Sequence, residues 1–184
     1  MVIILKLTKK ILYKLIFSFF FFKYFFLTYL RNRVIIFDID NTVANTWPSY
    51  LKKYKNEKER LSSLKPFKNI VKLILNYNKK GDKIIFMSAR DYRFYKLTKT
   101  WVEKNCIKNF ELILVSNPHE KLRLLKIFKN KNIIFYDDLS HSHKKGFVLF
   151  YEDILKELTK LKYIKHIGYD KLLTLQKKIY NENI

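Results

Sequence analysis

The sequence predicts an α/β fold: a parallel β-sheet with helices on both faces, preceded by a hydrophobic N-terminal helix. From Arg33 onward, short apolar runs alternate with amphipathic stretches, which is typical of strands that alternate with helices. Four of the apolar runs are followed directly by polar residues, as at the carboxyl edge of a parallel sheet, where ligands bind. We therefore divide the chain into a basic, hydrophobic segment at residues 1–32 and one domain at residues 33–184.

The apolar runs give the strands in chain order, with helices between them. The expected strands are residues 34–37, 83–87, 111–115, 132–136 and 163–167. Residues 147–151, FVLFY, fit either an additional edge strand or the beginning of a helix. Pro66 and Pro118 stand where helices would begin, and Asp91 and Asp170 precede periodic stretches as expected helix caps.

The N-terminal segment contains a long apolar run. Residues 11–30, ILYKLIFSFFFFKYFFLTYL, are long enough to cross a bilayer as a helix, with Lys23 well inside the run. A central lysine costs roughly 2.5 to 3.5 kcal/mol on insertion, whereas each Phe, Leu or Ile returns about 0.3 to 0.6 kcal/mol. Lys6, Lys10 and Lys14 would share one face, as in helices that lie on an anionic membrane. We expect a cytoplasmic protein associated with a membrane through this segment; the alternative is a helix packed on its own domain.

Composition narrows the classes of function. Lys and Arg total 38 against 16 Asp and Glu, and the net charge of +22 favours binding to polyanions, although lysines scattered along helices also form a solvated surface. The single cysteine, Cys106, excludes an intrachain disulfide and a cysteine-based zinc site, and it fits a reducing compartment. The three glycines lie far apart, so the chain has no glycine-rich phosphate-binding loop.

Two aspartates follow the first expected strand, in VIIFDIDNT. In an extended chain Asp38 and Asp40 point the same way, toward a ligand beyond the strand. Because carboxylates and a phosphate dianion repel one another, the pattern favours a divalent cation such as Mg²⁺, with Asp137 and Asp138 as further oxygen ligands. Asp38 could attack phosphorus. Asp40, its pKa raised by nearby negative charge, could protonate the leaving oxygen and later activate water.

Other polar residues could bind the phosphate itself. Ser88 offers a hydroxyl after the second strand, and Arg90 could grip a phosphate in a fork geometry. A lysine must balance the charge that builds up in the transition state. Lys121, near the start of the helix after Pro118, is better placed for this than the other candidate, Lys126.

Four segments, FDIDNT, MSAR, HEKLR and FYDDLS, resemble in order and spacing the motifs of the haloacid dehalogenase (HAD) superfamily, over roughly residues 34–167. The resemblance implies a Rossmann-like fold and a phosphatase with Asp38 as nucleophile and Asp40 as acid and base. It also implies Mg²⁺ held by Asp38, the backbone carbonyl of Asp40 and Asp137, with Asp138 as a ligand or a neighbour of the ligands. The positions that bind or neutralise phosphate correspond to Thr42, Ser88 and Lys121.

The chain departs from the HAD pattern at Asn41, where glycine is commoner. Asparagine tolerates left-handed backbone angles better than most residues, so we expect the turn to survive. About 40 residues separate Thr42 from the second strand, which is enough for two helices but not for the cap domain that many family members use to choose substrates. We therefore expect an open site.

The specific function stays open between three alternatives, two of which differ in the substrate. Residues 88–105, SARDYRFYKLTKTWVEKN, resemble a segment of phage-type polynucleotide kinase/phosphatases, and Tyr92, Arg93 and Tyr95 could hold a nucleic-acid strand. This favours a polynucleotide end. The N-terminal segment instead favours a nucleotide or sugar phosphate in membrane-linked glycan synthesis, and the third alternative is a non-catalytic, membrane-attached binding protein with the HAD fold.

Three aromatic residues near the motifs fit either the site or its surroundings. Trp47 could line the opening of the site and stack on a base or sugar, or it could be a packing residue. His141 and His143 follow the last acidic motif and could reach the surroundings of the metal, or they could lie in a solvated loop.

Overall fold

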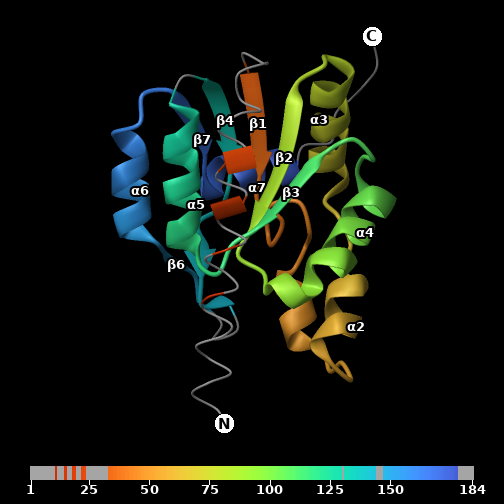
Figure 1. Ribbon diagram of the computed structural model, residues 1–184. Helices are drawn as coiled ribbons and strands as arrows, with labels where there is room; N and C mark the ends of the chain where they lie inside the picture. The colour runs from red at the N-terminus through yellow and green to blue at the C-terminus, as the bar shows by residue number, and fades with distance from the viewer. Residues whose placement is uncertain are drawn as a thin grey trace.

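The computed structural model describes residues 33–129, 131–143 and 147–177 and, before them, Ile11, Leu15, Ser18, Phe19, Phe22 and Lys23. Within this part of the chain, five parallel strands form one sheet in the order β3-β2-β1-β4-β7 (Figure 1). The strands are β1 (Arg33–Phe37), β2 (Lys83–Ser88), β3 (Glu111–Leu114), β4 (Asn132–Tyr136) and β7 (Ile164–Ile167). Each agrees with an expected strand to within one residue at either end, so the predicted α/β fold with a parallel sheet is confirmed.

Helices cover both faces of this sheet (Figure 1). One face packs against α3 (Lys68–Lys79), α4 (Tyr95–Asn105) and α7 (Tyr169–Lys177). The other face packs against α5 (Pro118–Leu125) and α6 (Glu152–Thr159). Successive strand residues point to opposite faces, so a strand covered on both sides is apolar throughout. This double burial explains the unbroken apolar runs.

Smaller elements connect the sheet and its helices. They are η2 (Trp47–Leu51), α2 (Glu57–Ser62), η3 (Tyr92–Phe94), η4 (Lys126–Phe128) and a separate antiparallel pair, β5 (Ser140–His141) with β6 (Leu149–Phe150). The stretch between β1 and β2 holds only η2, α2 and α3, as expected for a chain without a cap domain there. Residues 147–151 join no edge of the main sheet: two of them pair with β5, and α6 begins directly afterwards.

The expected helix caps are partly correct. Asp91 caps η3 by accepting a hydrogen bond from the Arg93 N–H, and Pro118 is the first residue of α5. Asp170 is not a cap, because α7 begins one residue earlier. Pro66 lies before α3, in an isolated bridge to Ala44.

The N-terminal segment at residues 1–32 falls mostly outside the described residues. Among those described, none of the helices has the length and the apolar composition needed to cross a membrane. Lys23 Nζ lies 2.7 Å from a carboxylate oxygen of Glu111 on β3, and Phe19 and Phe22 are exposed. Membrane association through this segment stays a prediction.

Candidate active site

The polar ends of several strands meet in one cavity of about 400 Å³ at the carboxyl edge of the sheet. The parallel register places Phe37 beside Phe86 and Tyr136, so the residues that follow these positions emerge side by side. The Asp38 N–H donates to the Tyr136 carbonyl at 2.8 Å and extends this register by one residue. The predicted site residues on the cavity wall are Asp38, Asp40, Ser88, Lys121, Asp137 and Asp138.

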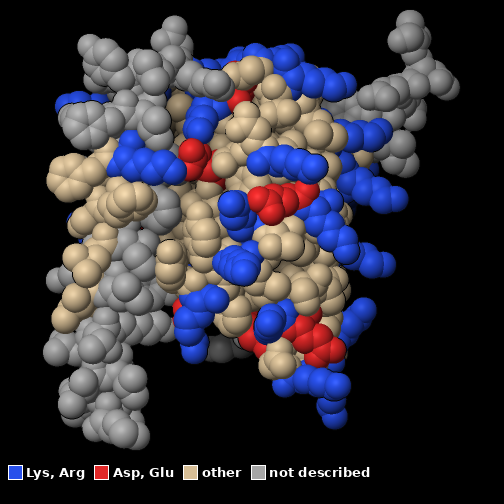
Figure 2. Space-filling view, turned by 45° about the vertical axis from the view of Figure 1, so that its right-hand side comes forward, with Lys and Arg blue, Asp and Glu red and all other residues tan. Residues whose placement is uncertain are grey.

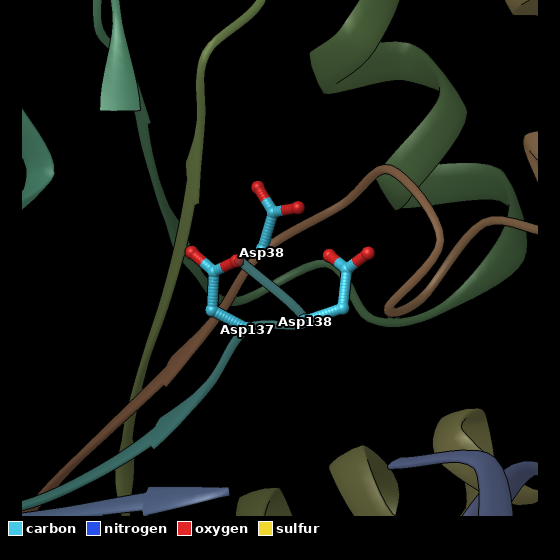
Figure 3. A group of neighbouring side chains, drawn as sticks. All are labelled: Asp38, Asp137 and Asp138. Carbon is cyan, nitrogen blue, oxygen red and sulfur yellow. The ribbon is translucent and has the colours of Figure 1, made fainter. Parts of the chain in front are cut away.

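Three carboxylates form a cluster in this cavity (Figure 3). Asp38, Asp137 and Asp138 each offer an oxygen, these oxygens lie within 4.8 Å of one another, and all three residues are buried. The Leu139 N–H and the Ser140 hydroxyl donate to Asp137 and Asp138, respectively, which fixes both side chains at the end of β4. A cluster of hard oxygen donors is the ligand set that Mg²⁺ prefers.

Lys121 lies against this cluster. Its Nζ is 2.7 Å from Asp38 Oδ1 and 2.8 Å from Asp137 Oδ2, with 4 % of the residue exposed. Asn117 caps α5 by accepting a hydrogen bond from the Glu120 N–H, and this sets the first turn so that Lys121 faces the cavity. Lys126 instead pairs with Glu157 at the surface, 3.5 Å away. Of the two candidate lysines, the fold brings only Lys121 to the carboxylates.

The cluster carries more negative charge than one lysine can neutralise. Burial raises the pKa of Asp38 to about 7; Lys121 opposes this shift, whereas Asp137 and Asp40 add to it. Burial and the charges of Asp137 and Asp38 also raise the pKa of Asp138 well above its usual value. A divalent cation would favour the ionised form of all three carboxylates, so these residues fit Mg²⁺.

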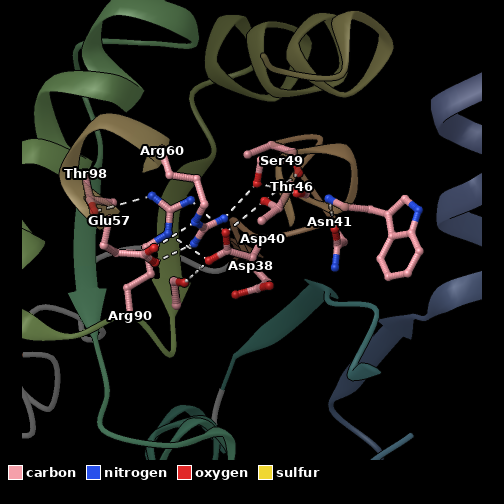
Figure 4. Close-up of polar contacts among 12 residues, drawn as sticks. Asp38, Asp40, Asn41, Thr46, Ser49, Glu57, Arg60, Arg90 and Thr98 are labelled. Atoms are coloured by element: carbon pink, nitrogen blue, oxygen red, sulfur yellow. Dashed lines mark hydrogen bonds and ion pairs between the residues drawn. The ribbon is translucent and has the colours of Figure 1, made fainter. Parts of the chain in front are cut away.

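Asp40 also lines the cavity, but Arg90 holds its carboxylate (Figure 4). Arg90 donates from Nε to Oδ2 and from Nη2 to Oδ1, both at 2.8 Å. Burial alone would raise the pKa of Asp40, but Arg90 and a hydrogen bond from Thr46 lower it to about 2. The predicted upward shift is therefore wrong, because it counted the neighbouring carboxylates and not the guanidinium. Arg90, expected to bind the substrate phosphate, pairs with Asp40 in this structure.

A second arm of the same network reaches Asp40 from the segment between β1 and β2 (Figure 4). Thr46 Oγ1 donates to Asp40 Oδ1 at 2.9 Å, and Ser49 Oγ donates to the Thr46 carbonyl at 2.6 Å. Arg60 of α2 donates to Ser49 Oγ at 2.8 Å and forms two hydrogen bonds with Glu57. Sequence reasoning missed this arm, because the burial of Arg60 follows from the fold and not from a motif.

Ser88 and Thr42, both expected to bind phosphate, differ in position. Ser88 lies on the cavity wall with its Oγ 3.4 Å from Asp40 Oδ2. Thr42 is fully buried and is not among the residues that line the cavity, and its hydroxyl has no hydrogen-bond partner in the described part of the chain. The expected turn is present: Asn41 has a φ of 57° and accepts a hydrogen bond from the Trp47 N–H at 3.0 Å.

The two histidines after the last acidic motif lie on the cavity wall rather than in a solvated loop. His143 is 9 % exposed, and its Nε2 is 2.6 Å from Ser140 Oγ. Trp47 touches the same histidine in an edge-on contact with 5.2 Å between the ring centroids. Tyr151 also lines the cavity and packs against His141. No motif pointed to this tyrosine.

The aromatic residues of the segment at 88–105 are mainly packing residues. Trp101 is buried, and its Nε1 donates to the Leu64 carbonyl at 2.8 Å. Tyr92 and Tyr95 lie with their ring centroids 5.4 Å apart and pack partly against the core. Arg93 pairs with Asp91 at the surface. A role of these residues in holding nucleic acid stays a prediction.

Comparison with protein families places this site in a known context. Residues 32–149, more than half of the chain, match the family model described as the phosphatase domain of polynucleotide kinase (PNKP). The chain belongs to this family. The match agrees with the HAD resemblance and includes every predicted site residue, whereas β7 and α7 of this PNKP-type phosphatase domain lie beyond it. A search among curated proteins finds no match.

Proposed function

We propose that the chain is a Mg²⁺-dependent phosphomonoester hydrolase that removes phosphate from a polynucleotide end through an aspartyl-phosphate on Asp38. The observation that carries this proposal is the buried group of Asp38, Asp137 and Asp138 with Lys121 in contact. The complete set of residues argues against a non-catalytic binding protein. Asp38, Asp137 and the backbone carbonyl of Asp40 would hold Mg²⁺, with Asp138 as a ligand or neighbour. The bound ion would neutralise charge on the phosphate oxygens.

In the first step, an oxygen of Asp38 attacks phosphorus and the bond from phosphorus to the ester oxygen breaks. The ester oxygen leaves with a proton from Asp40. Lys121 stabilises the charge that grows on the equatorial oxygens, and Ser88 donates to one of them. Asp40 must be protonated for this step, which Arg90 disfavours as long as the two side chains stay paired.

In the second step, water attacks phosphorus of the aspartyl-phosphate, Asp40 takes the proton of that water, and inorganic phosphate and the Asp38 carboxylate are released. This step needs Asp40 ionised and oriented. Arg90 and Thr46 provide both, because their hydrogen bonds fix the two carboxylate oxygens and favour the charged form.

A polynucleotide end fits the family and the surface charge. Figure 2 shows Lys and Arg side chains far outnumbering Asp and Glu on one face of the molecule, in line with the net charge of +22. Such a surface attracts a polyanion over a distance, whereas a sugar phosphate gains little from it.

A substrate panel with Mg²⁺ tests the proposal. A 3′-phosphorylated oligonucleotide should be turned over, and its kcat/KM should fall steeply with added salt, because each phosphate contact releases counterions. A mononucleotide should give a shallower slope. Replacing Arg93 and Lys96 with Ala should weaken the oligonucleotide reaction and spare the mononucleotide. Two results would contradict the choice of a polynucleotide end. One is an equal salt slope for the oligonucleotide and the mononucleotide. The other is faster turnover of a sugar phosphate of the kind used in glycan synthesis at every salt concentration.

A further inference from the structure

A second cavity of about 480 Å³ adjoins the active site. The two cavities share three wall residues, Asn41, Asp138 and His143. Beyond them the second cavity changes character: its wall consists mainly of aromatic and aliphatic side chains, among them Trp47, Phe67, Tyr169, Leu172 and Leu173. Its volume lies in the range of small-molecule sites.

We propose that this cavity binds the base of the nucleoside whose phosphate is bound at Asp38. The proposal rests on the proposed phosphatase function and names the part of the substrate that the second cavity recognises. The shared wall at Asn41 and His143 places the two cavities next to each other, as the base and phosphate of one nucleotide require.

The chemistry of the wall favours a base over a sugar. A base has two apolar faces and stacks on aromatic rings, of which the cavity offers Trp47, Phe67 and Tyr169. A sugar carries hydroxyls around its ring, and burying these against Leu172 and Leu173 without partners would be costly. The polar groups of a base lie in the plane of its ring, so polar side chains of the wall, such as Asn45, can pair with them while both faces stay against apolar groups.

The wall is fixed to the loop that carries the catalytic aspartates. Gln176 of α7 donates from Nε2 to the Asn41 carbonyl at 2.7 Å and lies 3.4 Å from the Thr42 carbonyl. The backbone N–H of Trp47 is bonded to the Asn41 side chain. A base between Trp47 and α7 would therefore be held in a constant relation to Asp38, which is what positioning of the phosphate requires.

The wall also uses a part of the chain that the family match does not include. Tyr169, Leu172, Leu173, Gln176 and Lys177 all lie after residue 149, where the match ends. Recognition of the base would thus combine residues of the matched region, such as Trp47 and Phe67, with residues of α7.

Two 3′-phosphorylated oligonucleotides test this inference in the full-length protein with Mg²⁺. They differ only in the last nucleotide, which carries a base in one and is abasic in the other. The wild-type protein should prefer the base by about tenfold in kcat/KM, the size of one stacking contact. Trp47→Leu should lose most of this preference, because the KM for the substrate with the base should rise toward the KM for the abasic one. Leu51→Ala, in the same 3₁₀ helix but exposed and outside the cavity wall, should keep it.

Equal rates on both substrates in the wild type, or an unchanged preference in Trp47→Leu, would overturn the inference. A chain that hydrolyses neither substrate overturns the proposed function instead, and tryptophan fluorescence then tests the cavity by itself. Deoxyadenosine 3′-phosphate should quench the fluorescence of the wild type and not that of Trp47→Leu, because the remaining Trp101 is buried in the core. Inorganic phosphate is the control ligand. A base site is contradicted if deoxyadenosine 3′-phosphate changes the fluorescence of the wild type no more than inorganic phosphate does.

Discussion

The active-site cavity and the apolar cavity beside it share a wall but are built in different ways. In the first, the predicted members are polar residues that follow strands or lie near the start of a helix, and all of them lie within the family match. The second brings together Trp47 and α7, which are far apart in the sequence. Short motifs at strand ends thus supply the residues of the phosphatase site, whereas the packing of distant segments forms the second cavity, which we propose binds the base.

Replacing Asp38, the proposed nucleophile, should have the largest effect, and the effect should fall on the first cavity alone. We expect Asp38→Asn to abolish turnover, a loss of more than about a thousandfold, because an amide cannot form the phosphoenzyme. The thermal midpoint should not fall, since the change removes one buried negative charge from a crowded cluster. Phosphate release and circular dichroism measure the two effects. A variant with a tenth of wild-type activity and an unchanged spectrum would exclude Asp38 as nucleophile.

The second largest effect should come from Asp40. Asp40→Asn should slow the reaction by about 10² to 10⁴, the usual contribution of a general acid or base. With a good leaving group the phosphoenzyme should still form, so that its hydrolysis becomes the slow step. Rapid-quench kinetics with an aryl phosphate and an alkyl phosphate distinguish the two steps. Normal rates on both substrates would remove Asp40 from the acid and base role.

Lys121 and Lys126 offer a matched pair. Lys121→Met should reduce kcat by about 10² to 10³, because the only ammonium in contact with Asp38 and Asp137 among the described residues is lost. Lys126→Met should change kcat little, because that side chain lies at the surface beside Glu157. Steady-state kinetics on one substrate suffices. Equal losses in both variants would contradict the assignment.

The smallest effect is on stability and concerns the metal. Without Mg²⁺ the thermal midpoint should fall as the pH rises from about 4 to about 7, because the pKa of Asp38 goes from 3.8 to about 7 on folding. A group whose pKa is raised on folding stabilises the fold at pH values below its unfolded pKa. This contribution is lost as the pH rises through its folded pKa. Mg²⁺ at 100 times its Kd should restore about 2.7 kcal/mol at neutral pH. The same pH scan of Asp137→Asn is the control. We expect Mg²⁺ to stabilise this variant less than it stabilises the wild type.

The features that could be predicted from the sequence are those set by the periodicity of strands and by motifs at their ends. The strands and the meeting of Asp38, Lys121 and Asp137 could be predicted. The carboxyl ends of parallel strands meet at one edge of the sheet, and Lys121 lies near the start of the helix that follows the third strand. The low pKa of Asp40 could not be predicted, because it depends on the two hydrogen bonds that the Arg90 side chain donates to the Asp40 carboxylate. The same holds for Arg60, for the burial of Thr42 away from the cavity wall and for the packing of Trp47 against His143. These features depend on side-chain direction and long-range packing, which periodicity does not encode.

Catalysis through Asp38 requires a covalent aspartyl-phosphate, which can be trapped. The Asp40→Asn protein is mixed with Mg²⁺ and a radiolabelled aryl phosphate, whose good leaving group can depart without a proton from Asp40. The reaction is stopped with acid, and the protein is digested. We expect label on the peptide that contains Asp38. Hydroxylamine should release it, as it releases an acyl phosphate, and the label should be absent when Asp38 is also changed to Asn. Phosphate release without any labelled protein, or label on another residue, would contradict catalysis through Asp38.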